Sequence, residues 1–131
     1  RHIWRSNSGV LRGNRGEAVI AEYQRFVGTT SGAYKELTRD EGRLAAAGLG
    51  LVGEAGEASE LIKKGIFHGH GTDTEALHKE LGDVLWYVAE LCNATGTTLE
   101  KVIHKNMDKL KRRYPDGWSS QKSIAREDER R

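Results

Sequence analysis

Four acidic side chains stand in two pairs with helical spacing. Glu54 and Glu57 are three residues apart, and so are Glu80 and Asp83. Residues at this spacing lie on one face of an α-helix, with Cβ atoms about 5–6 Å apart. Carboxylate oxygens are the ligands that hard divalent cations prefer, Mg²⁺ above all, with Mn²⁺ as a substitute. The two pairs therefore predict a metal site, provided that their helices face each other.

The elements that position these pairs are predicted to be helices. Apolar residues recur at intervals of three and four, no strand-like alternation is found, and Pro115 is the single proline. This pattern predicts four α-helices, over residues 17–27, 40–64, 72–94 and 97–114. Short connections between them predict an all-α fold with the helices in a four-helix bundle.

The ends of the third and fourth helices carry recognisable signals. Thr72 with Glu75, and Thr97 with Glu100, have the spacing of capping boxes, in which the threonine caps the first turn. Gly96 stands where a glycine commonly ends the preceding helix. We therefore expect the third helix to begin at the first threonine and the fourth at the second.

A glycine-rich loop joins the second and third helices, which are therefore expected to run antiparallel. Each acidic pair borders an apolar stripe, since Glu54 follows Leu51 by three residues and Asp83 precedes Val84. Four carboxylates at such a half-buried seam would repel one another, and no lysine or arginine is interleaved with them. A divalent cation is the simplest compensation, and solvent-exposed helix faces without an ion are the alternative.

The second helix is also unusually rich in glycine. Each of its five glycines costs about 0.5–1 kcal/mol relative to alanine in a helix interior. These are Gly42, Gly48, Gly50, Gly53 and Gly56. We therefore expect this helix to be held by close packing, with another backbone or a ligand near the small residues.

The fourth helix carries the opposite charge to the acidic seam. Residues 98–114 hold six bases and two acids, and Asn106 is spaced to fall on the inward stripe. Lys109 and Arg113 follow along the same edge, so the three side chains could form a clamp for a polyphosphate. A solvated basic face is the alternative interpretation of the same charges.

Charge is distributed unevenly along the 131 residues. The formal net charge is +2, yet residues 1–16 hold four arginines and no acid, and residues 119–131 hold four bases and three acids. Residues 17–118 hold 13 bases and 16 acids, so the basic character comes from the ends. We expect a basic N-terminal extension (1–16), a helical domain (17–118) and a polar C-terminal tail (119–131). This distribution argues against nucleic acid as a partner.

The sequence also bears on the compartment. No segment reaches the roughly 18 apolar residues of a membrane span, and residues 1–16 lack the apolar centre of a signal peptide. The single cysteine, Cys92, lies among apolar helical residues, which favours a buried thiol over a reactive one. These features predict a cytoplasmic protein with no membrane contact.

The acidic pairs and their surroundings resemble MazG-type nucleotide pyrophosphohydrolases. The similarity lies in the order and spacing of short segments within residues 20–118. These are GLVGEAGE at 50–57, KK at 63–64, ELGDVLWY at 80–87, NMDKL at 106–110 and RYP at 113–115. The family's first motif is Glu-Glu-x-x-Glu, and Gly53 stands here in place of its first glutamate, which leaves four acidic positions.

The resemblance implies an all-α nucleoside-triphosphate pyrophosphohydrolase fold, a homodimer or homotetramer, and a catalytic role for residues 17–118. Glu54, Glu57, Glu80 and Asp83 match the family's Mg²⁺ ligands, and either of the two glutamates on the second helix would orient the attacking water. Tyr87 matches a position that contacts the nucleotide, and Asn106, Lys109 and Arg113 match the phosphate-facing helix. Trp86 is expected on a different face from Tyr87.

The reaction implied is hydrolysis of a nucleoside or deoxynucleoside triphosphate to the monophosphate and pyrophosphate, by water attack at the α-phosphate. Two alternatives remain open. One is an enzyme similar to phosphoribosyl-ATP pyrophosphohydrolase, which shares the fold and the metal ligands. The other is a non-catalytic helical interaction module that retains the fold alone.

Overall fold

A computed structural model describes residues 13–35, 40–126 and 129. Six helices follow one another: α1 (Gly13–Thr30), α2 (Gly32–Lys35), α3 (Asp40–Phe67), α4 (Thr74–Ala94), α5 (Leu99–Arg113) and α6 (Ser120–Ala125). No strand is present in these described ranges, so the predicted all-α class is confirmed. Most of the expected basic N-terminal extension (1–16) lies outside the described residues.

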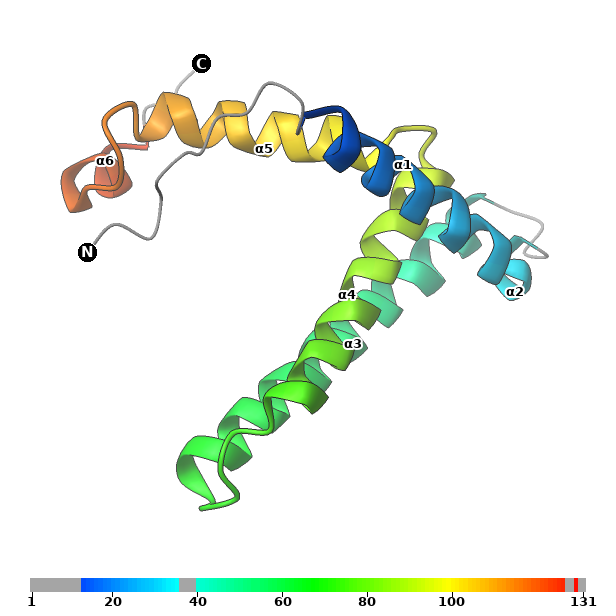
Figure 1. The fold of residues 1–131 in the computed structure, drawn as a ribbon, viewed down its shortest axis with the longest axis horizontal. Coiled ribbons are helices and arrows are strands. Elements are labelled where there is room, and N and C mark those ends of the chain that lie inside the picture. Colours follow the sequence, from blue (N-terminus) through cyan, green and yellow to red (C-terminus); the bar gives the residue numbers. More distant parts are fainter. Residues whose placement is uncertain (1–12, 36–39, 127–128, 130–131) are drawn as a thin grey trace.

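Helices α3 and α4 form an antiparallel hairpin, as their short connection predicts. Figure 1 shows the two long helices side by side, with the connection at one end and α1 crossing the other. Their contact is the most extensive between any two described helices. The hairpin therefore holds both acidic pairs in facing helices.

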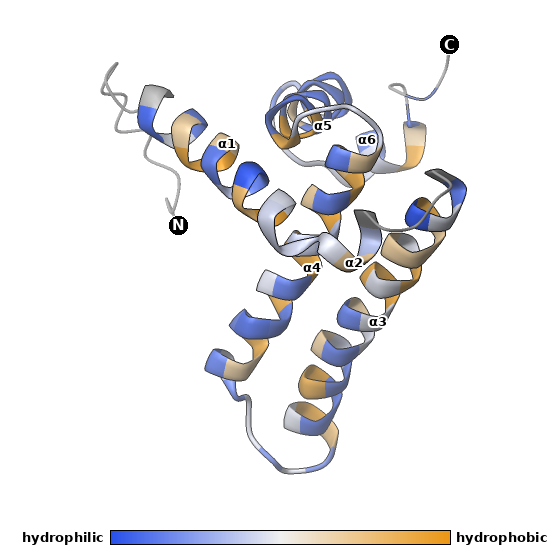
Figure 2. Cartoon of the chain, turned by 90° about the vertical axis from the view of Figure 1, so that its right-hand side faces the viewer, coloured by the Kyte–Doolittle hydropathy of each residue, from blue (hydrophilic) through white to orange (hydrophobic). Residues whose placement is uncertain are grey.

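The four long helices do not close into a bundle within one chain. Helix α5 contacts α1 and the end of α4, and it leads away from the hairpin in Figure 1 and lies above it in Figure 2. Of its apolar residues Leu99 is buried and Ile103 packs on the core, whereas Val102, Met107 and Leu110 remain exposed. Of this predicted inward stripe only Leu99 and Ile103 thus pack on the described core, which corrects the expectation of a four-helix bundle.

The core lies where α1, α4 and α5 meet. Val27, Ala89, Cys92 and Leu99 are buried there, which confirms the buried position expected for the cysteine thiol. Gln24 crosses the same junction: its Nε2 donates to Asn93 Oδ1 at 2.8 Å, and its Oε1 accepts from the Leu99 N–H at 2.8 Å. That second bond satisfies a backbone N–H at the start of α5, which has no partner within its own helix.

The start of α5 is displaced by one residue from the prediction. Thr98, not Thr97, is the N-cap, and its side chain accepts from the Lys101 N–H at 3.1 Å. Thr97 instead belongs to the end of α4, because its N–H donates to the Cys92 carbonyl at 3.0 Å. Gly96 lies between them in the chain and has a φ of +70°. This geometry is the glycine-ended helix terminus that the sequence predicts.

The start of α4 is displaced in the same way. Asp73, not Thr72, is the N-cap, and its side chain accepts from the Ala76 N–H at 3.0 Å. The helix therefore begins at Thr74. Aspartate is at least as good an N-cap as threonine, so the capping-box spacing alone did not decide between the two.

The expected polar C-terminal tail (119–131) contains a short helix. Helix α5 ends at Arg113, one residue before the predicted end at residue 114, and Gly117 makes the turn with φ of +90°. The short helix α6 follows, capped by the Ser119 side chain, which accepts from the Lys122 N–H at 3.1 Å.

A buried ion pair ties the beginning of α3 to the end of α4. Glu90 is fully buried, and Arg43 Nε and Nη2 both lie 2.8 Å from its Oε1. The other oxygen, Oε2, has no hydrogen-bond partner among the described residues. The carboxylate therefore depends on one arginine for its compensation.

Replacing Arg43 with methionine should destabilise the fold by about 3–5 kcal/mol, because it leaves a buried charge without its partner. The double variant R43M/E90L should recover most of that loss, since it removes both charges and keeps the volume. Urea unfolding followed by circular dichroism measures both effects. Arg25→Met, on the exposed face of α1, is the control and should change stability by less than about 0.5 kcal/mol. Equal stability of R43M and R25M would contradict the assignment.

Candidate metal and nucleotide site

Three of the four predicted metal ligands meet on the hairpin. Glu54 of α3 and Glu80 and Asp83 of α4 each present a carboxylate oxygen, and these oxygens lie within 4.8 Å of one another. No lysine or arginine of the described chain forms an ion pair with any of them. The predicted convergence of the two acidic pairs is thus present for three members.

Glu57 is not part of this group. It is exposed, one turn further along α3 than Glu54, and its charge still contributes to raising the pKa of the Glu54 carboxyl. Its predicted role as a metal ligand therefore stays a prediction. Its position leaves it beside the three carboxylates rather than among them.

The electrostatics of the group are those of a site for a cation. Partial burial raises the pKa of the Glu54 carboxyl, and the negative charge of Asp83 raises it further, followed by a hydrogen bond and the charge of Glu80. All these causes oppose ionisation of Glu54 as long as no cation is near. A divalent ion with a preference for oxygen reverses each electrostatic contribution, so the donor set fits Mg²⁺ or Mn²⁺.

Aromatic side chains border the carboxylates. Glu54, Asp83, Trp86 and Tyr87 line a hollow of about 280 Å³. The two aromatic rings lie edge to face, with centroids 5.0 Å apart. Trp86 therefore shares the hollow with Tyr87, contrary to the expectation that it points to a different face. Its Nε1 donates to Thr30 Oγ1 at 2.8 Å, which connects the hollow to α1.

Tyr87 is held from two sides. Its hydroxyl lies 3.0 Å from that of Tyr34 in α2, and this hydrogen bond, with burial second, raises the pKa of Tyr87 to about 12. On the other side its ring packs against Gly50 of α3, where an added Cβ would collide with the ring. The phenol therefore stays neutral at physiological pH and its ring has little room to turn.

The other four glycines noted in the predicted second helix do not share this role. An added Cβ at Gly42, Gly48, Gly53 or Gly56 would meet nothing within 4 Å. The expectation that all five glycines admit a close neighbour is therefore met at Gly50 alone among them, within one chain.

The predicted phosphate-binding residues lie elsewhere. Asn106 and Lys109 are exposed on the part of α5 that leads away from the hairpin. The prediction that Asn106 points inward is therefore wrong for a single chain, because its side chain is exposed. Arg113 is buried at the end of α5, where its Nη2 lies 2.9 Å from Glu129 Oε1. One chain does not bring these three residues to the carboxylates.

Two supporting residues were not identified from the sequence. Tyr34 lies between the first and second predicted helices, and an aromatic side chain there was the available signal. Glu90 follows Asp83 by seven residues, which places both on one face of α4. Extending the acidic series by two more turns would have found Glu90, but not its arginine partner.

The comparisons with known proteins bear on this arrangement. Residues 44–118, which include all four acidic positions, match the MazG nucleotide pyrophosphohydrolase domain. The chain belongs to this family. The resemblance predicted from the acidic motifs is thus confirmed.

A phage protein is among the relatives of this MazG-family chain. The "Gene 37 protein" of Mycobacterium phage L5 is 42% identical over 73 residues, which cover 53% of this chain and 64% of that protein. The match therefore covers a little under two thirds of the relative's length. No solved structure matches the chain. No described helix combines the length and apolar character needed to cross a membrane.

Gly50→Ala should displace the Tyr87 ring and lower the thermal stability, although alanine favours a helix by about 1 kcal/mol over glycine. Gly53→Ala is the matched control three residues away, where the added methyl group meets open space and should stabilise the helix by about 0.5–1 kcal/mol. Thermal unfolding followed by circular dichroism compares them. Equal stabilisation by both substitutions would show that the ring does not depend on Gly50.

Glu54→Gln should stabilise the metal-free protein at neutral pH. The folded-state pKa of Glu54 is raised, so the unfolded chain loses this proton at lower pH and stability falls as pH rises through that window. The gain of the variant should therefore vanish below the ordinary glutamate pKa. Thermal unfolding with a chelator at several pH values measures it, and Glu41→Gln, exposed on α3, is the control. A pH-independent difference between E54Q and the parent would contradict the repulsion.

Proposed function

We propose that this chain is a Mg²⁺-dependent nucleoside-triphosphate pyrophosphohydrolase, which converts a (d)NTP and water to the (d)NMP and pyrophosphate. The observation that carries the proposal is the group of Glu54, Glu80 and Asp83 beside an aromatic hollow in a MazG-family chain. Carboxylates suit the metal, and a hollow with aromatic walls suits a base.

The metal would be held by Glu54, Glu80 and Asp83, and Glu57 lies beside this group. Bound there, Mg²⁺ supplies neutralisation of phosphate charge and acidification of a coordinated water molecule. The chain's own part is to hold three carboxylates close together on two helices. The α3–α4 contact keeps these helices side by side.

The water's oxygen forms a bond to the α-phosphorus while the bond from that phosphorus to the α–β bridging oxygen breaks. The electron pair of that bond leaves with pyrophosphate, and the water's proton passes to a carboxylate. Glu57 suits the role of base, because it lies beside the group and outside it. Glu54 is the second candidate, since its raised pKa favours holding a proton.

The nucleobase of the substrate would lie in the hollow against Tyr87 and Trp86. Tyr87 is fixed by Tyr34 and by the surface of Gly50, so the ring is positioned before the nucleotide binds. A wall fixed in advance costs less ordering on binding than a free side chain does. Selectivity for a particular sugar and nucleobase would depend on the shape of the rest of the hollow.

Asn106, Lys109 and Arg113 keep their proposed role toward the phosphates. Because α5 leads away from the hairpin, we propose that a second copy of the chain brings Asn106 and Lys109 to the carboxylates. Exposed apolar side chains on α3 support a dimer or tetramer, with Leu49 75% and Val52 70% exposed in a single chain.

Light scattering of the purified chain should give a mass at least twice 14.6 kDa. Leu49→Lys together with Val52→Lys should reduce it to that of one chain, because both charges would enter the apolar contact. Val19→Lys, at an exposed position on α1, is the control and should leave the mass unchanged. A monomeric parent protein would contradict the proposed assembly.

Glu57→Gln should lower kcat by about 10²–10⁴-fold, the usual contribution of a general base, and keep the rise in melting temperature that Mg²⁺ produces. Glu54→Gln should lose both, and Glu75→Gln, exposed at the start of α4, should lose neither. The assay separates the nucleotide products of a panel of NTPs, dNTPs and phosphoribosyl-ATP. Activity of E57Q equal to the parent would remove Glu57 as the base.

The products distinguish the alternatives. Release of NDP and phosphate would move the cleavage to a different bond, and turnover of phosphoribosyl-ATP alone would identify the related enzyme. A chain that neither hydrolyses nor binds any nucleotide with Mg²⁺, measured by calorimetry, would be a non-catalytic interaction module.

A further inference from the structure

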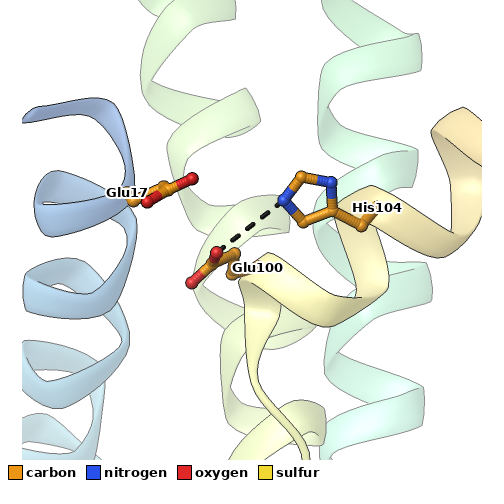
Figure 3. A group of neighbouring side chains, drawn as sticks. All are labelled: Glu17, Glu100 and His104. Carbon is orange, nitrogen blue, oxygen red and sulfur yellow. Dashed lines mark ion pairs between the residues drawn. The ribbon is translucent and has the colours of Figure 1, made fainter. Parts of the chain in front are cut away.

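A second group of potential metal ligands lies at the other end of the molecule from the α3–α4 loop. Figure 3 shows Glu17 of α1 pointing toward Glu100 and His104 of α5. One donor atom from each lies within 4.8 Å of the others. None of the three belongs to the carboxylate group of the hairpin, and the proposed pyrophosphohydrolase reaction does not use them.

The spacing within the group is that of shared ligands. His104 Nε2 and Glu100 Oε1 lie 3.7 Å apart, which is longer than the 2.7–3.2 Å of a direct hydrogen bond. Two ligand atoms bound to one tetrahedral ion at 2.0–2.2 Å lie about 3.4 Å apart. The distance between these two atoms is thus close to the one that a shared ion would require.

The two carboxylates of the group also lack a lysine or arginine partner among the described residues. Glu17 and Glu100 come from different helices. A simple surface pair four residues apart on α5 would not involve a third residue from α1. The approach of Glu17 is therefore the observation that separates this group from an ordinary helical ion pair.

We propose that Glu17, Glu100 and His104 bind a borderline divalent cation, for which Zn²⁺ is the best match. Zn²⁺ accepts imidazole nitrogen and carboxylate oxygen in one site, whereas Mg²⁺ and Ca²⁺ prefer oxygen alone. Three protein ligands leave a further coordination position for water or a small anion. Glu100 also lines a hollow of about 280 Å³ with Gln24, Arg25 and Asn93, which would give such a ligand access.

The ion would join α1 to the first turns of α5. Without it the junction rests on the small core and on the bonds from Gln24 to Asn93 and Leu99. A metal bridge between the two helices would fix the direction in which α5 leaves the hairpin. The site is thus structural in effect, and its loss should loosen α1.

The test is a titration of the full chain with Zn²⁺, followed by calorimetry, and with Co²⁺, followed by its visible absorption. The chain carries Glu80→Gln and Asp83→Asn so that the hairpin carboxylates do not compete. We expect one ion per chain, a tetrahedral Co²⁺ spectrum, and slower hydrogen exchange in α1 when Zn²⁺ is bound. His104→Ala and Glu17→Gln should each weaken binding at least about tenfold.

His78→Ala, an exposed histidine of α4 outside both groups, is the control and should bind as tightly as its parent. Circular dichroism confirms that each variant is folded, and Glu17→Gln keeps the shape of the side chain. The proposal is overturned if no Zn²⁺ binds, if H104A and E17Q bind as well as the parent, or if binding is lost instead in His68→Ala/His70→Ala, which would place the ion in the α3–α4 loop.

Discussion

Repulsion between carboxylates, imposed by the packing of α3 against α4, is the constraint on which the rest of the structure depends. Glu54, Glu80 and Asp83 are drawn together by the helix contact, and they oppose it unless a cation is present. The hairpin therefore has to be held by other contacts along its length. An ion pair between Arg43 and Glu90 provides one at the far end, away from the loop.

The other contacts hold the hairpin on both sides of the acidic group. At the loop, an added Cβ on Gly65 would lie 3.0 Å from the Gly71 carbonyl oxygen, so the connection lies directly against the end of α3. Between the acids and the buried ion pair, the Tyr87 ring fills the space that Gly50 leaves open. The same ring is a wall of the hollow, so one packing contact both supports the hairpin and shapes the site.

The sequence predicts features that depend on local spacing and periodicity. It does not predict features that depend on residues far apart in the chain. The helices and the facing of Glu54 with Asp83 follow from spacing and from one short loop. The N-caps are displaced by one residue because a neighbouring cap or a preceding helix end competes, which a motif does not reveal. The pairing of Tyr34 with Tyr87 across 53 residues has no local signal. The direction of α5 depends on the turn at Gly96, and a turn residue alone does not give an interhelical angle.

The position of α5 also explains why the basic helix and the acidic seam are separate in one chain. Their opposite charges would favour contact, yet α5 is directed away by the turn and by its packing on α1. Val102, Met107 and Leu110 of α5 stay exposed, as do Leu49 and Val52 of α3. Exposed apolar stripes next to complementary charge are what a protein–protein contact requires. Assembly of several copies would therefore bury these apolar side chains and also bring the basic residues of α5 to the acidic residues of the hairpin. Folding of one chain does neither.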